Sequence, residues 1–196
     1  YHTAAHKHVH YMEAFPAEAV KNNIAGTVNV IDAARATGTS RVVMLSTDKA
    51  ADPQGIMGAT KRIAEFVMAS RNVPGGPRLV TVRFGNVLAS GGSVVPLFVA
   101  QINAGGPVTV SHEDATRFFM SIKEACMLVV QASLMGEGGE IFILKMGEPI
   151  RIAELARDLI ALHGLKPGTD VKIEYTGLRP GEKLHESLVA HGEQAS

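Results

Sequence analysis

The chain has 196 residues, of which 46% are hydrophobic, so it is long enough for one domain or for one domain and part of another. Its 19 basic and 19 acidic residues balance, which argues against a nucleic-acid partner. A single cysteine excludes an internal disulfide and favours a reducing compartment, so we expect a cytoplasmic protein. The apolar runs are shorter than the roughly 20 residues of a membrane helix, so we expect no membrane contact by this segment.

The first half of the chain predicts alternating strands and helices. It begins without Met, in residues 1–10 that read as the end of a strand and a loop, so we expect a fragment whose beginning lies elsewhere. Apolar spacing predicts helices over 16–37 and 58–71, and continuous apolar runs predict parallel strands over 41–47 and 79–84. The side chains of the second helix that should face inward are Ile63, Phe66 and Val67.

The second half is less regular but still alternates. Ser121 and Glu124 form an S-x-x-E capping box ahead of an apolar helix. The elements expected here are helix 93–104, strand 107–111, helix 126–134, strand 140–146, helix 152–163 and strand 171–175. Strands and helices in this order indicate an α/β fold with a parallel sheet.

Five motifs then stand in one order along the chain. They occupy residues 4–9, 23–27, 46–49 with 57–61, 83–87 and 179–183. In this order and spacing they resemble the UDP-N-acetylglucosamine 4,6-dehydratases of capsule and flagellin-glycan biosynthesis, which are extended short-chain dehydrogenases. The resemblance runs from residue 1 to about residue 189.

The resemblance implies a Rossmann-like parallel sheet that lacks its first third, with a small C-terminal α/β substrate-binding domain. Residues 1–89 would be the C-terminal part of the NAD-binding domain. Residues 90–196 would be mainly the nucleotide-sugar-binding subdomain, with strand 140–146 returning to the main sheet. In the family, the missing third carries the G-x-G-x-x-G turn that binds the NAD pyrophosphate, and this chain has no such motif.

The resemblance also implies the chemistry. A 4,6-dehydration moves a hydride from C4 to NAD, eliminates water across C5 and C6, and returns the hydride to C6. Asp48 would be the acid for the C6 hydroxyl and Lys49 the base at C5, so Asp48 must hold a proton and Lys49 must be neutral. Ser46 matches the family's Ser or Thr near the C4 hydroxyl. These residues follow a predicted parallel strand, where ligands of open α/β sheets bind.

Met57 departs from the usual Y-x-x-x-K pattern of short-chain dehydrogenases. It holds the position of the Tyr that takes the C4 hydroxyl proton, and Lys61 holds the Lys position. A thioether cannot accept that proton. The large, membrane-associated branch of the family also has Met there, so Met57 indicates a branch rather than an inactive enzyme. We hypothesise that a water held by Thr47 and Asp48 takes the proton instead.

The cofactor implied by the resemblance is NAD(P), with NAD expected. Lys61 would hydrogen-bond the nicotinamide ribose, and Asn23 would organise the site from its helix. Ala4, Ala5 and Lys7 match the loop that touches cofactor and substrate.

The expected substrate is a UDP-sugar. Its diphosphate needs cationic forks, which Arg117 and Arg179 would supply. The other residues expected to bind substrate are Arg83, Asn86, Ser90, Ser93, Val94 and Glu182.

Two other functions stay open. A nucleotide-sugar 4-epimerase would usually keep the Tyr and lack the Asp48–Lys49 pair. A non-catalytic module that only binds a nucleotide sugar would explain Met57 and the missing glycines, but has no evident need for Asp48, Lys49 and Lys61 together. The alternating histidines at 6, 8 and 10 suggest a metal site, yet no Cys or carboxylate completes it, so we expect no metal.

Self-association is expected by analogy with the superfamily. Its members pair through a four-helix interface that corresponds to helices 16–37 and 58–71, so we expect a homodimer. For a full-length parent, the membrane-associated branch adds an expected position at the cytoplasmic face of the membrane.

Overall fold

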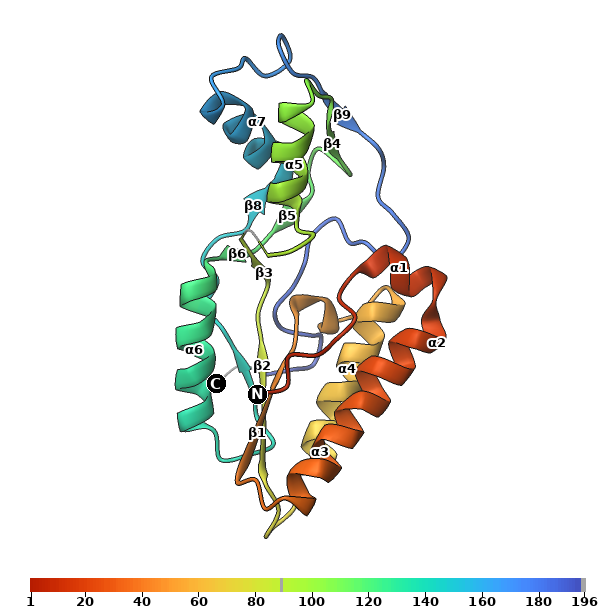
Figure 1. The fold of residues 1–196 in the computed structure, drawn as a ribbon, viewed down its shortest axis with the longest axis vertical. Helices are drawn as coiled ribbons and strands as arrows, with labels where there is room; N and C mark the ends of the chain where they lie inside the picture. The colour runs from red at the N-terminus through yellow and green to blue at the C-terminus, as the bar shows by residue number, and fades with distance from the viewer. Residues whose placement is uncertain (89, 195–196) are drawn as a thin grey trace.

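A three-stranded parallel sheet forms the centre of the molecule (Figure 1). The computed structural model describes residues 1–88 and 90–194. Strands β1 (Arg41–Leu45), β2 (Arg78–Arg83) and β7 (Ile141–Ile143) lie in the order β1-β2-β7, and both pairings are parallel. The strands are apolar because helices cover both faces of the sheet.

One face of the sheet is covered by two long helical segments (Figure 1). The first runs through α2 (Pro16–Ala19), the π-helix η1 (Val20–Ala25) and α3 (Gly26–Ala36). The second is α4 (Ile56–Ser70). The core that these helices share with the sheet consists of Ile31, Ala34, Val42, Met44, Ala64, Met68 and Leu79.

The opposite face is covered by α6 (Ile122–Met135) (Figure 1). Its predicted capping box is confirmed. The Ser121 hydroxyl accepts from the Glu124 backbone N–H, and the Glu124 carboxylate accepts from the Ser121 backbone N–H. Each bond satisfies a backbone donor that the helix itself leaves unpaired.

A smaller lobe lies at one end of the sheet (Figure 1). It contains α5 (Val94–Asn103), β4 (Val108–Val110), α7 (Ile152–Leu162) and β9 (Ile173–Tyr175), with β4 and β9 paired in parallel. Its separate core consists of Phe98, Ile102, Val108, Val110, Ala115, Ile152, Ala156, Ile160 and Val171.

Two short strand pairs connect the sheet with the smaller lobe. Strand β3 (Asn86–Val87) pairs in parallel with β6 (Phe119–Met120), and β5 (Thr116–Arg117) pairs antiparallel with β8 (Ile150–Arg151). The short helix α1 (Val9–Ala14) faces this junction from the side of α4. The junction therefore gathers residues that are far apart in the sequence.

The predicted helices and strands are confirmed, with ends that differ by a few residues. The inward orientation of Ile63 and Phe66 is wrong, because these side chains are 45% and 55% exposed while Ala64 and Met68 face the sheet. The predicted helix over 16–37 is confirmed as a continuous helical segment, whose middle is π-helical. No helix within residues 1–88 and 90–194 is both long and apolar enough to cross a membrane.

Candidate active site

The carboxyl end of β1 turns sharply into the short 3-10 helix η2 (Asp48–Ala50). Thr47 caps this turn, since its hydroxyl accepts from the Lys49 backbone N–H at 3.4 Å. Helix α4 then passes so close that a Cβ on Gly58 would lie 2.2 Å from the Lys49 carbonyl oxygen. Only glycine permits that approach, which fixes the turn against the start of α4.

Lys49 is the centre of a polar cluster at this turn. Its Nζ lies 2.9 Å from Asp48 Oδ1, 3.2 Å from Asn86 Oδ1 and 3.5 Å from Glu186 Oε1. The Asp48 and Glu186 side chains are almost fully buried, and each has one oxygen without a hydrogen-bond partner among the described residues. Two buried carboxylates therefore share one ammonium group.

A cavity of about 350 Å³ opens beside this cluster. Its wall includes the predicted catalytic residues Ser46, Thr47, Lys49, Met57 and Lys61. The same wall contains the predicted cofactor and substrate residues Ala5, Lys7, Asn86, Ser90, Ser93 and Val94. The volume lies within the usual range of small-molecule sites. Asp48 lies behind the wall, with its free Oδ2 near Gly85, where a Cβ would come within 3.2 Å of it.

Lys61 reaches the cavity from α4. Its Nζ donates to the Leu45 carbonyl oxygen at 2.7 Å, which ties the helix to the end of β1. Burial lowers the pKa of Lys61 to about 8, although the negative charge of Glu65 acts in the opposite direction. Lys61 is therefore a buried amine with a lowered pKa, and it lies one helical turn beyond Met57.

Asn23 lies on η1 and organises the loop before α1 rather than lining the cavity. Its side chain accepts from the His6 backbone N–H at 2.8 Å and donates to the His6 carbonyl oxygen and to the Thr60 hydroxyl. A π-helical turn is a common feature of functional sites, and here it carries a fully buried Asn. Ala4 is exposed and outside the cavity wall, whereas Ala5 and Lys7 of the same loop belong to it.

A second hollow of about 270 Å³ adjoins the first, and both have Lys49 and Asn86 in their walls. It contains the predicted substrate residues Arg117, Arg179 and Glu182. Arg117 is held by the carbonyl oxygens of Thr116 and Leu184, and Glu182 accepts from the Arg179 backbone N–H at 3.1 Å. The second hollow thus adds two arginines to the lysines that line the first.

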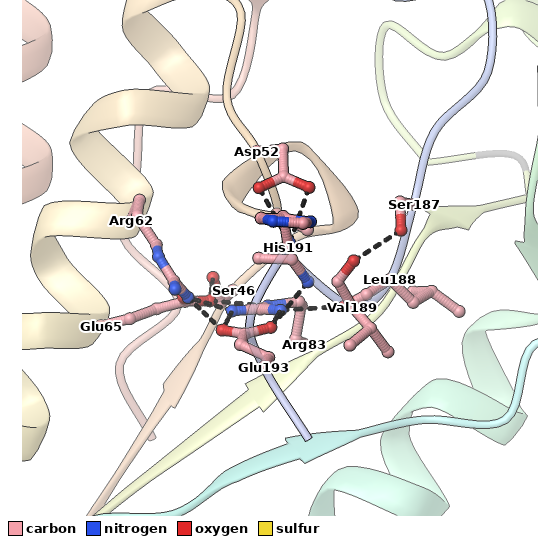
Figure 2. A network of polar contacts seen from close by, with 12 residues as sticks. Ser46, Asp52, Arg62, Glu65, Arg83, Ser187, Leu188, Val189, His191 and Glu193 are labelled. Carbon is pink, nitrogen blue, oxygen red and sulfur yellow. Dashed lines mark hydrogen bonds and ion pairs between the residues drawn. The ribbon is translucent and has the colours of Figure 1, made fainter. Parts of the chain in front are cut away.

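Arg83 is not brought to this site. It is the last residue of β2 and is fully buried, and its guanidinium binds the carboxylates of Glu65 and Glu193 (Figure 2). Burial lowers the pKa of Arg83, but the hydrogen bonds to Glu193 and Glu65 outweigh it and raise that pKa above its ordinary value. The Arg83 hydrogen bond also lowers the pKa of Glu193 to about 2. The substrate contact predicted for Arg83 is corrected, since a saturated, buried guanidinium has no path to a ligand.

Three carboxylates of this region were missed from the sequence. Glu186 follows the motif at 179–183, Glu65 lies one helical turn beyond Lys61, and Glu193 lies near the C-terminal end. The four-residue step from Lys61 could have indicated Glu65, whereas no spacing marks the other two. Within residues 1–88 and 90–194, no group of three His, Cys, Asp or Glu side chains converges as a metal site.

The whole chain, residues 1–196, matches the family model of polysaccharide biosynthesis proteins. The chain belongs to this family. It is 55% identical to the capsular polysaccharide biosynthesis protein CapD of Staphylococcus aureus, over 98% of this chain and 32% of that protein. It is 52% identical to the probable polysaccharide biosynthesis protein EpsC of Bacillus subtilis (strain 168), over 99% of this chain and 33% of that protein. The chain thus spans about a third of the length of these relatives.

Other proteins similar to this family member include sugar-nucleotide enzymes and solved structures. A UDP-glucose 4-epimerase of Rickettsia canadensis is 39% identical over 100% of this chain and 57% of that protein. The solved structure of Pen from Bacillus thuringiensis is 41% identical, with a TM-score of 0.88, over 96% of this chain and 59% of that chain. DesIV of Streptomyces venezuelae, a dTDP-glucose 4,6-dehydratase with NAD and TYD bound, is 23% identical, with a TM-score of 0.84, over 96% and 63% of the two chains. The predicted α/β fold with a Rossmann-like sheet is confirmed.

Lys61 should make the stability of this family member depend on pH in the alkaline range. Its pKa is about 8 in the folded protein and 10.5 ordinarily, so between these values the unfolded chain binds the extra proton. The free energy of unfolding should rise by up to ~3 kcal/mol from about pH 8 to about pH 10 because of this residue. Urea unfolding of Lys61→Met should show less of that rise than the wild type. Lys172→Met, at an exposed lysine, is the control, and equal pH dependence in all three proteins would contradict the assignment.

Proposed function

We propose that the protein containing this chain is an NAD-dependent UDP-N-acetylglucosamine 4,6-dehydratase of surface polysaccharide biosynthesis. The observation that carries the proposal is Lys49 in the cavity wall, 2.9 Å from the buried Asp48 carboxylate. A dehydratase needs an acid and a base for the elimination across C5 and C6, in addition to the removal of hydride from C4. These two residues supply both groups, with Lys49 in the wall and Asp48 directly behind it.

The nicotinamide end of NAD fits the side of the cavity formed by Ala5, Met57 and Lys61. NAD, when bound, supplies the acceptor and later the donor of the hydride. The buried Lys61 ammonium, whose pKa is lowered to about 8, would donate hydrogen bonds to the hydroxyls of the nicotinamide ribose. The Met57 side chain is 3% exposed and gives the wall an apolar surface that excludes water.

Proton transfer in the proposed reaction falls to three consecutive residues. Lys49 first passes one proton to the Asp48 carboxylate, 2.9 Å away. Its neutral Nζ then removes the C5 proton, and Asp48 gives its proton to the C6 hydroxyl as water leaves. Asp48 lies behind the wall, but its Oδ1 is 2.9 Å from the hydroxyl of Thr47, which is in the wall. Thr47 thus links the buried carboxyl with the cavity. The C4 proton that Met57 cannot take would pass through a water on Thr47 to the solvent.

The UDP moiety fits the adjoining hollow. Arg117 and Arg179 are the cations there, and guanidinium groups suit a diphosphate because they bind two oxygens at once. Lys7 and Asn86 line both hollows. They would therefore lie beside the bond that joins the sugar to the diphosphate. The Ser93 hydroxyl is buried without a hydrogen-bond partner in the described part of the chain, which favours a ligand contact at that point.

A 4-epimerase is the second candidate, favoured by the identity to the Rickettsia canadensis enzyme over the whole of this chain. Epimerisation needs hydride removal and return at C4, but no acid at C6 and no base at C5. The buried cluster of Lys49, Asp48 and Glu186 would then have no role in the reaction. The same grouping argues against a module that only binds nucleotide sugars, since binding alone requires no buried acid and base beside the cavity.

The direct test uses the full-length protein that contains this chain, with NAD and UDP-N-acetylglucosamine. The expected product has lost one water and shows a C4 ketone and a C6 methyl group by mass spectrometry and NMR. An isomer of unchanged mass would establish the epimerase instead. A bound but unchanged substrate would establish the binding module. Lys49→Met should lower the rate of water loss about a hundredfold or more, whereas Lys172→Met should not change it.

Thr47→Val tests the route of the C4 proton. It removes the hydroxyl that would hold the water, so formation of NADH in a single turnover should be abolished. Thr169→Val, at an exposed threonine, is the matched control. A normal rate of NADH formation in Thr47→Val would exclude this route.

We also infer a homodimer through α4 and the helical segment that runs through α2, η1 and α3. Ile63 and Phe66 expose apolar surface on α4, and Val20 does so at the start of η1. Phe66→Asp should shift the protein from dimer to monomer in sedimentation velocity at micromolar concentration, because it places a charge in the contact. Leu162→Asp, at an 81% exposed residue of the smaller lobe, should leave the dimer intact. A wild-type monomer would contradict the inference.

A further inference from the structure

Glu186 is a buried carboxylate to which the proposed reaction gives no role. Its side chain is 2% exposed, and its Oε1 lies 3.5 Å from Lys49 Nζ. Lys49 lines both hollows, and Glu186 lines the second one. The Glu186 Oε2 atom is buried and has no hydrogen-bond partner in residues 1–88 and 90–194. A desolvated charge is unfavourable unless it is paired, so the ion pair with Lys49 is what makes this position tolerable for a carboxylate.

The chain on both sides of Glu186 is fixed by other contacts. Before it, the backbone N–H of Thr116 in β5 donates to the Leu184 carbonyl oxygen at 3.0 Å. After it, the Leu188 carbonyl oxygen accepts from Arg83 Nη1 at 2.9 Å (Figure 2). Glu186 therefore has a fixed position that does not depend on its own ion pair.

Glu186 and Asp48 differ in how they contact the Lys49 ammonium. Asp48 Oδ1 lies 2.9 Å from Lys49 Nζ, a hydrogen-bond distance along which a proton can pass. Glu186 Oε1 lies 3.5 Å from the same nitrogen, which is too long for direct proton transfer. The proton that leaves Lys49 therefore goes to Asp48, and Glu186 keeps its negative charge.

We propose that Glu186 is a positioning residue whose fixed negative charge promotes the loss of water by acting on Asp48 and Lys49. The proposal rests on the proposed function for the roles of that pair. In the resting enzyme Lys49 and Asp48 are both charged. When Lys49 has taken the C5 proton, it is charged again, but Asp48 still holds the proton for the C6 hydroxyl. Glu186 therefore keeps its attraction to Lys49 and loses its repulsion from Asp48, so its charge lowers the barrier.

The removal of hydride from C4 gains nothing from this charge. Hydride passes to NAD and the C4 proton passes to the solvent, so neither Lys49 nor Asp48 changes its charge. In the elimination, the C5–H bond breaks as Nζ takes the proton, and its electron pair forms the C5–C6 double bond. The C6–O bond breaks as the oxygen takes the Asp48 proton. Of these two steps, the elimination should depend on Glu186, which distinguishes the proposal from a purely structural role.

The test follows both steps in the full-length wild type and in Glu186→Gln, with NAD and UDP-N-acetylglucosamine. Glutamine has nearly the same shape as glutamate but no charge. Formation of NADH in a single turnover should stay within about twofold of the wild type, whereas loss of water should slow about tenfold or more. NADH should then accumulate, because the hydride returns only after water has left. Equal slowing of both steps, or a normal rate of water loss, would overturn the proposal.

Glu193→Gln is the matched control, because Glu193 holds the same C-terminal segment through Arg83 but forms no ion pair with Lys49 among the described residues. It should lower the melting temperature and leave the ratio of the two rates as in the wild type. Both rates come from one sample, so their ratio does not depend on the fraction of protein that is folded. A fall in this ratio as large as that in Glu186→Gln would overturn the proposal.

Failure of this proposal is distinguishable from failure of the proposed function. If the wild type loses water and Glu186→Gln loses it equally fast, only the role of Glu186 is overturned. If the wild type gives an isomer of unchanged mass, the dehydratase is overturned, and the role of Glu186 in the elimination is overturned with it.

Discussion

The buried Arg83 guanidinium, held between Glu65 and Glu193, is the interaction on which the rest of the structure depends. It ties the last residue of β2 to α4 and to the C-terminal end of the chain (Figure 2). Breaking a buried pair of this kind typically destabilises a protein by about 3–5 kcal/mol, because it leaves a charge unpaired. The same cluster extends to the end of β1, where the Ser46 hydroxyl donates to Glu65 Oε1 at 2.6 Å.

The site is assembled where rigid elements end. The turn after β1 carries Thr47, Asp48 and Lys49, and Gly58 allows α4 to lie directly against it. Asn86 reaches Lys49 from the strand that links the sheet to the smaller lobe. Catalytic groups on such ends are positioned by the sheet while remaining open to a ligand. This arrangement explains how a small chain holds two carboxylates and two lysines at one cavity.

The sequence predicted the elements well because their apolar periodicity is strong, and it predicted the Ser121 capping box to the residue. Ser46, Thr47 and Lys49 could be placed at a ligand site because they follow a parallel strand. Met57 and Lys61 were added to that site only through the family resemblance. The Arg83 cluster could not be predicted, since its partners lie 18 and 110 residues away and no local spacing connects them. The exposed side of α4 was predicted wrongly because the spacing of apolar residues is the same whether their face packs on a sheet or on another surface.

The central claim is that Lys49 removes the C5 proton of a UDP-sugar, and isotope exchange tests it most directly. The reaction of the full-length protein with UDP-N-acetylglucosamine and NAD would be run in D₂O. If Lys49 is the base, the product carries deuterium at C5, and Lys49→Met gives neither product nor exchange into the substrate. A product without deuterium at C5, or full exchange in Lys49→Met, would contradict the account.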